Sequence, residues 1–191
     1  MSSAALTHQI VFLLGEGKRG RSLGRRTLAQ RTGLSEMTVR LEMERLRDEG
    51  LLALNKDGGV LTPVGIERFV SLFANVKAAR AISLTTLTQE AVVLAALLTC
   101  PATRPPWWYR DQVVKEGGSA LILVRRRPDG WAFHPDGEQV GERNPCAEQM
   151  LADAFPLSHD QDLLVIVSAA DRRHAGLGLW RVISEILAET A

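Results

Sequence analysis

Nine residues near the start of the chain concentrate positive charge. The segment KRGRSLGRR, residues 18–26, contains five cations and two glycines. The five cations are Lys18, Arg19, Arg21, Arg25 and Arg26. A charge run is often a solvated loop, but cations are also what the phosphates of a nucleic acid require. The elements that follow favour phosphate contacts, with Arg21, Arg25 and Arg26 as the candidates.

The next stretch, RTGLSEMTVRLEMERLRDEGLL at residues 31–52, has the signals of a turn followed by a helix. Gly33 can adopt the positive φ of a tight turn, Ser35 is a favourable N-cap, and Gly50 is a favourable end. The pattern therefore predicts a helix at about 35–49, whose buried stripe is Val39, Met43 and Leu46.

The N-terminal end of this helix carries side chains that could read base edges. Arg40 could bind guanine with two hydrogen bonds, and Thr38 could contact a phosphate or a thymine methyl group. Glu36 either accepts a hydrogen bond from cytosine or stabilises the helix dipole. Together with Ser35, these residues are the candidates for contacts in the major groove.

Elements on either side position this helix. Apolar spacing predicts a first helix through residues 6–14 and a second at about 25–31, with Leu28 and Ala29 inward. Two apolar runs around Lys56-Asp57-Gly58-Gly59 predict a hairpin, in which Lys56 could reach a phosphate or the minor groove. Pro63 then begins a fourth helix, expected to run to about Arg80.

The motifs TLAQRTGLSEMTVR, Leu46 before EGLL, and GGVLTPVG together resemble prokaryotic winged helix-turn-helix transcription regulators. The similarity spans about residues 5–75. It implies a DNA-binding domain at residues 1–80, and double-stranded DNA as the partner.

The sequence after about residue 84 predicts alternating strands and helices. EAVVLAALL (90–98) fits a strand or a buried helix, with the strand favoured, and YRDQVVKEGG fits a short helix. A hairpin (SALILVRR and GWAFHP), a helix from Asn144, a strand (DLLVIVSAA) and a final helix follow. The predicted fold class is α+β, with an N-terminal winged helix-turn-helix domain followed by a small α/β sandwich-like domain at about 84–191.

Arg110-Asp111, Gly117-Gly118 and DLLVIVSAAD resemble segments of archaeal winged-helix proteins with an uncharacterised C-terminal α/β domain. The resemblance implies a domain for dimerisation, ligand sensing or both. The residues best suited to a small anionic effector are Arg110, Asp111, Lys115, Gly117 and Gly118.

No set of residues in the sequence has the spacing of a catalytic or metal site, so we expect no enzyme activity, cofactor or metal. Chance convergence of His134, Cys146 and His159 is the alternative for a metal. AGLGLW (175–180) suits close helix packing better than a dinucleotide site, and Arg125–Arg127 suit a solvated hairpin better than an anion site.

The formal net charge of +1 conceals two unlike halves. Residues 1–80 contain 13 Lys and Arg against 8 Asp and Glu, whereas residues 81–191 contain 10 against 14. A polyanion should therefore meet the first half. Two cysteines, the lack of a signal-like start and the lack of a long apolar run predict a cytoplasmic protein with no membrane span.

One winged helix reads few base pairs, so a homodimer on a palindrome is expected. The region of the fourth helix and the exposed-looking Trp107 and Trp108 are candidate contacts of that dimer. The alternative function is a winged-helix protein-interaction module that does not bind DNA.

Overall fold

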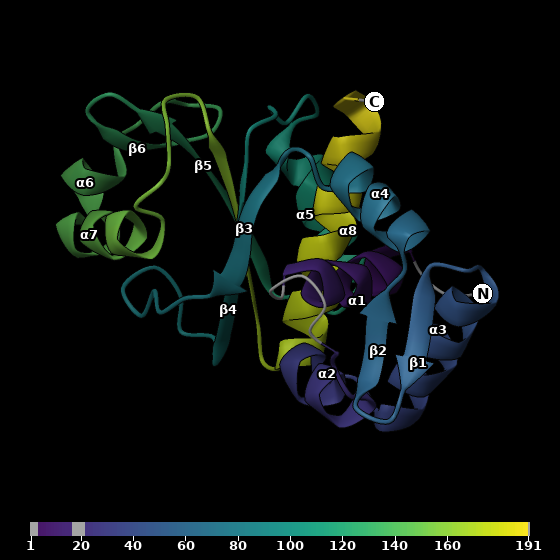
Figure 1. The fold of residues 1–191 in the computed structure, drawn as a ribbon. Coiled ribbons are helices and arrows are strands. Elements are labelled where there is room, and N and C mark those ends of the chain that lie inside the picture. Colours follow the sequence, from purple (N-terminus) through teal and green to yellow (C-terminus); the bar gives the residue numbers. More distant parts are fainter. Residues whose placement is uncertain (1–3, 17–21, 191) are drawn as a thin grey trace. The chain divides into compact units, whose positions relative to one another are not determined.

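The computed structural model describes residues 4–16 and 22–190, which form two compact units (Figure 1). The first unit is Met1–Ala74 and the second is Asn75–Ala191. The first is mainly helical, and the second is built on a sheet. The predicted α+β class is therefore confirmed.

The first unit follows the predicted order of helices and hairpin. Its elements are α1 (Ala4–Glu16), α2 (Arg25–Thr32), α3 (Glu36–Asp48), β1 (Leu52–Asn55), β2 (Gly58–Leu61) and α4 (Pro63–Leu72). Helices α2 and α3 enclose the predicted turn, where Gly33 has a φ of 76°. Ser35 caps α3, because its hydroxyl accepts a hydrogen bond from the Thr38 amide at 3.0 Å. Gly50 has a φ of 74° just after α3, as its predicted position at the helix end requires.

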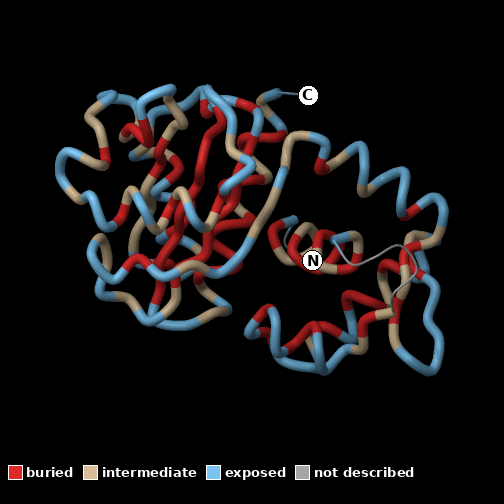
Figure 2. Tube along the Cα trace, turned by 60° about the vertical axis from the view of Figure 1, so that its left-hand side comes forward, coloured by how far each residue is buried: buried red, intermediate tan, exposed pale blue. Residues whose placement is uncertain are grey.

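The core of the first unit is made from one face of each helix and the inner side of the hairpin. Ile10, Leu28, Val39 and Leu46 are fully buried, and Leu52 is nearly so. Burying a side chain of this size stabilises a fold by about 1.5 to 3 kcal/mol. The buried segments of these elements face one another in the trace of this unit (Figure 2). The inner stripe predicted for residues 35–49 is therefore correct.

The predicted fourth helix is too long. Helix α4 ends at Leu72, and β3 (Val76–Ala81) follows it. Two apolar residues within α4, Ile66 and Val70, are exposed. Strand β3 instead forms backbone hydrogen bonds with β4 (Val92–Leu98), a partner that local spacing does not reveal.

The second unit contains an antiparallel five-stranded sheet in the order β3-β4-β7-β5-β6. Its other elements are α5 (Pro106–Lys115), β5 (Ala120–Arg127), β6 (Gly130–Phe133), α6 (Val140–Arg143), α7 (Pro145–Ala154), β7 (Leu163–Ala169) and α8 (Arg172–Thr190). The favoured strand at 90–98 is present as β4. Helix α6 was not predicted, and α5 begins early enough to include Trp107 and Trp108.

Helices cover both faces of this sheet. Helices α5 and α8 pack on one face, while α6 and α7 cover part of the other (Figure 1). Strand β7 lies between β4 and β5 and is buried at every position. The core under α7 includes Val124, Trp131 and Leu151, all fully buried. No helix in the described parts of the chain is long and apolar enough to cross a membrane.

Candidate nucleic-acid interface

Three segments of the first unit line a surface groove of about 450 Å³. Helix α3 contributes Arg40, the start of α2 contributes Arg25, and the hairpin tip contributes Lys56. The sequence placed these three cations in separate elements. The fold brings them to one groove.

A short backbone pairing holds the start of α2 beside the hairpin. The amides of Leu23 and Gly59 each donate to the other residue's carbonyl at 3.0 Å. Gly58 permits this approach, because a Cβ at that position would lie 2.3 Å from the Leu23 carbonyl oxygen. This pairing was not predicted from the sequence. Its signal was the double glycine in the hairpin, which suits a close approach of another chain segment.

The hairpin tip is a two-residue turn at Lys56 and Asp57. The Asn55 side-chain oxygen accepts a hydrogen bond from the Asp57 amide at 2.9 Å, which fixes the turn. Lys56 is exposed, and neither it nor the exposed Arg26 forms an ion pair with a residue that the structure describes. Both cations can therefore bind a phosphate without first breaking an ion pair with a carboxylate.

The other two arginines at the groove have exposed carboxylate partners. Arg40 Nε lies 3.3 Å from Glu44, and Arg25 Nε lies 3.5 Å from Glu36. The four side chains are between 39% and 60% exposed, and exposed ion pairs contribute about 0.2 to 1 kcal/mol. A phosphate or a base edge can displace such partners at small cost. Glu36 is thus a partner of Arg25 as well as a first-turn carboxylate.

Ser35 and Thr38 lie at the N-terminal end of α3 and bond to each other. Their hydroxyl oxygens are 2.8 Å apart, in addition to the cap at the Thr38 amide. Neither residue lines the groove, and nor does Glu36. Arg21, also predicted to contact DNA, lies outside the described residues.

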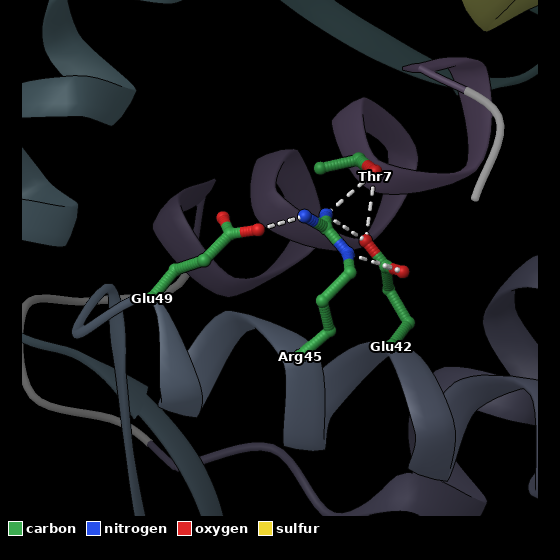
Figure 3. A network of polar contacts seen from close by, with 4 residues as sticks. All are labelled: Thr7, Glu42, Arg45 and Glu49. Carbon is green, nitrogen blue, oxygen red and sulfur yellow. Dashed lines mark hydrogen bonds and ion pairs between the residues drawn. The ribbon is translucent and has the colours of Figure 1, made fainter. Parts of the chain in front are cut away.

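A polar network that was not predicted fixes α3 against α1 (Figure 3). Arg45 donates to both oxygens of Glu42, at 3.1 and 2.6 Å, and to the Thr7 hydroxyl at 3.0 Å. Thr7 donates to Glu42 at 2.7 Å, and Arg45 also pairs with Glu49. Glu42 is only 3% exposed, and its hydrogen bonds raise the pKa of Arg45. Arg45 therefore joins α3 to α1 and does not line the groove.

Helix α3 and the hairpin also expose apolar side chains. Met37, Leu41 and Leu54 are 57%, 56% and 42% exposed. Met37 and Leu41 are four residues apart, so they share one side of α3. A thymine methyl group or an apolar surface of a protein would suit these side chains.

The candidates for an effector site lie on α5 and in the turn that follows it. Arg110 and Lys115 are five residues apart, which places them roughly 140° apart around the helix. Gly117 and Gly118 end the helix: Gly117 has a φ of 84°, and the Gly118 amide donates to Val113 at 2.9 Å. Arg110 and Asp111 are exposed on α5.

The basic triplet of β5 divides between the two faces of the sheet. The Arg126 guanidinium lies 5.7 Å from the Trp131 ring centre, whereas Arg125 and Arg127 approach the Gln161 side-chain oxygen at 3.4 and 3.5 Å. Burial, followed by the charge of Arg125, lowers the pKa of nearby His134.

Two further sequence interpretations concern packing and metal binding. Gly178 packs closely, because a Cβ there would lie 3.2 Å from Val113. The alternative of a metal site at His134, Cys146 and His159 fails, since these described residues form no metal-binding group.

Residues 17–75 match the family model described as the CggR N-terminal DNA binding domain. The match includes α2, α3, both strands of the hairpin and α4. It supports a DNA-binding regulator.

The whole chain is similar in structure to "Hypothetical protein PH0730 from Pyrococcus horikoshii OT3", with a TM-score of 0.80. The two are 19% identical, and the similarity covers 99% of this chain and 95% of the other. At this identity the similarity shows a shared fold alone. No functionally curated protein matches the chain.

Proposed function

We propose that the protein is a cytoplasmic transcription regulator that binds double-stranded DNA through its first unit. Helix α3 enters the major groove with its N-terminal half, and the start of α2 and the hairpin tip contact the flanking backbone. The family match at residues 17–75 supports DNA binding. The observation that carries the finer proposal is the groove that brings Arg25, Arg40 and Lys56 together.

The cations have two roles in this proposal. Arg40 projects from α3 and binds guanine, because its planar guanidinium matches the two acceptors of that base. Arg25, Arg26 and Lys56 bind phosphates. The N-terminus of α2 assists them, since its N-cap Gly24 provides no side-chain hydrogen bond to the first-turn amides.

The test is selection of bound fragments from genomic DNA, followed by measurement of affinity for the selected site at several salt concentrations. Arg40→Ala should weaken binding by about 1 to 3 kcal/mol and relax the sequence preference at one position. Lys56→Ala should weaken binding to all sequences alike and reduce the salt slope by about one unit.

Arg31→Ala is the matched control, because it removes one cation from the same unit at the far end of α2. Arg31 pairs with Glu16 and does not line the groove. If Arg31→Ala lowers affinity as much as Arg40→Ala, net charge explains binding and the proposed groove contacts are wrong.

The proposal includes a homodimer assembled through the second unit. Trp107 and Val114 are 63% and 53% exposed and lie seven residues apart, on one side of α5. Trp108 is half-buried, with the Arg104 guanidinium 4.1 Å from its ring centre, which leaves Trp107 as the aromatic contact. Sedimentation equilibrium should show a dimer that Trp107→Arg dissociates. A dimer unaffected by this change would place the interface elsewhere.

A second candidate is a protein-interaction module without DNA binding. It is favoured by α3 itself, which contains four acidic and three basic residues and exposes Met37 and Leu41. The two candidates differ in the selection experiment. Salt-dependent retention of DNA supports the regulator, and failure to enrich any sequence supports the module. Neither candidate assigns a catalytic step to the chain.

A further inference from the structure

The second unit has an apolar pocket of about 410 Å³ next to the edge strand β3. Ala78 and Leu97, which are paired across β3 and β4, line it together with Phe155 and Leu157. Leu157 is 77% exposed. A pocket of this size with an apolar lining is typical of sites for small organic molecules.

The pocket exists because the helix that covers this face of the sheet, α7, ends before it reaches β3. Helix α7 stops at Ala154, and the chain turns away through Phe155 and Pro156. The small side chain of Ala78 leaves the space that a larger residue would fill. Larger side chains of the same sheet face, such as Ile166, lie in the core next to α7.

One side of the pocket carries positive charge from β3. The Arg80 guanidinium lies 5.3 Å from the Phe155 ring centre and forms no ion pair with a described residue. Lys77 Nζ lies 2.6 Å from the buried carboxylate of Asp162 and 2.8 Å from His159 Nδ1. The charges of Lys77 and Asp162 cancel. Arg80 therefore leaves the pocket rim with a net charge of one positive unit, with His159 counted as neutral.

We propose that this pocket binds a small monocarboxylate with an apolar body. The apolar part lies against Ala78, Leu97 and Phe155, and the carboxylate pairs with Arg80. A guanidinium binds a carboxylate with two parallel hydrogen bonds, which suits this anion better than an uncharged alcohol.

The position of the pocket also gives it a route to the DNA-binding unit. Strand β3 begins at Val76, and only residues 73–75 separate it from the end of α4. Ligand contacts with Ala78 and Arg80 therefore act on the strand that is covalently joined to the first unit. This regulatory step rests on the proposed function, whereas binding of the ligand does not.

Isothermal titration of the full chain with three probes tests the site. Octanoate has both the apolar body and the charge, 1-octanol has the body alone, and inorganic phosphate has charge alone. Octanoate should bind at least about tenfold more tightly than octanol, as expected for one charge-assisted pair. Phosphate should not bind at the pocket.

Two substitutions and their controls locate the binding. Arg80→Gln should reduce octanoate affinity to that of octanol, whereas Arg173→Gln, at an exposed arginine on α8, should have no effect. Ala78→Phe should fill the pocket and abolish binding, whereas Ala79→Phe, on the other face of β3, should retain it. Methyl NMR shifts at Leu157 on addition of octanoate to the unaltered chain provide a test that does not require any variant to fold.

Several results would overturn the proposal. The first is equal affinity for octanol and octanoate. The second is binding of phosphate but not octanoate, with the phosphate binding lost in Arg80→Gln. The third is no shift of the Leu157 methyl signals at saturating octanoate. Affinity for selected DNA is then measured with and without octanoate. Unchanged DNA affinity would refute the regulatory step alone, and absence of DNA binding both with and without octanoate would refute the proposed function while leaving the pocket intact.

Discussion

Replacing Arg45 by Met should destabilise the first unit more than any other change of a surface arginine in α3. The substitution removes three hydrogen bonds to Glu42 and Thr7 but keeps most of the aliphatic stem. It leaves the Glu42 carboxylate, 3% exposed, without its cation. Breaking a fully buried pair costs about 3 to 5 kcal/mol.

The cost here should be lower, because the Arg45 side chain is 37% exposed and water can replace part of its contribution. We expect a loss of about 2 to 3 kcal/mol in the free energy of unfolding. For a unit of this size, that corresponds to a fall in Tm of roughly 10 to 20 °C.

The assay needs a signal from the first unit. All four tryptophans lie between residues 107 and 180, so their fluorescence reports on the second unit. Thermal unfolding followed by far-ultraviolet circular dichroism includes the helices of both units, and amide hydrogen exchange of α1 and α3 assigns the change to the first.

Arg47→Met is the matched control, because Arg47 is on the same helix and pairs with the exposed Asp48. It should cause little change. A Glu42→Gln/Arg45→Met double variant should recover part of the loss, since it removes the uncompensated charge. The reasoning is refuted if Arg45→Met and Arg47→Met have the same Tm, or if Glu42→Gln worsens Arg45→Met.

Three more predictions concern backbone, titration and capping. Gly58→Ala should cost roughly 2 to 3 kcal/mol in denaturant unfolding, because a Cβ there meets the Leu23 carbonyl, whereas Gly50→Ala, with nothing within 4 Å, should cost about 1. The NMR-titrated pKa of His8 should lie below 6.5, since burial and then Arg68 lower it, and Arg68→Gln should restore only part of the shift. Because the pKa of His8 is lower in the folded protein, His8 of the unfolded chain binds a proton at higher pH as the pH falls. The contribution of His8 to stability is therefore present above pH 6.5 and declines below it. Asn144→Ala should destabilise the second unit by about 1 kcal/mol in thermal unfolding, because Asn144 caps the Ala147 amide at 3.0 Å. An unchanged Tm would show that water replaces this cap.

The elements of the first unit were predictable because their signals are local. The turn at Gly33, the cap at Ser35 and the end at Gly50 each depend on residues within one or two helical turns. Strand β3 was not predictable in this way. Its residues pair with β4, whose sequence is about 16 positions later, and no local pattern specifies that partner.

In the candidate site too, local features could be predicted and contacts between distant segments could not. The sequence identified the cations, because charge and element type are local properties. It could not show that Arg45 joins Thr7 of α1 to the buried Glu42, since Glu42 and Arg45 occupy helix positions that spacing alone assigns to a polar side. Nor could it show the Leu23–Gly59 pairing, which brings the start of α2 to the hairpin and depends on two distant segments.

The carboxylates beside the proposed DNA contacts have a physical consequence for specificity. Glu36 and Glu44 pair with Arg25 and Arg40 in the free protein, and both would lie near phosphates if α3 approached DNA without displacing them. Their repulsion from the backbone weakens binding to every sequence alike. A site with guanine at the right position offers Arg40 two hydrogen bonds in return, whereas another base offers fewer. The acidic residues of α3 would therefore lower the affinity for all sequences by a similar factor, so that only a site with the guanine contact keeps enough affinity to be occupied; this reconciles the mixed charge of the helix with the proposed role in reading DNA.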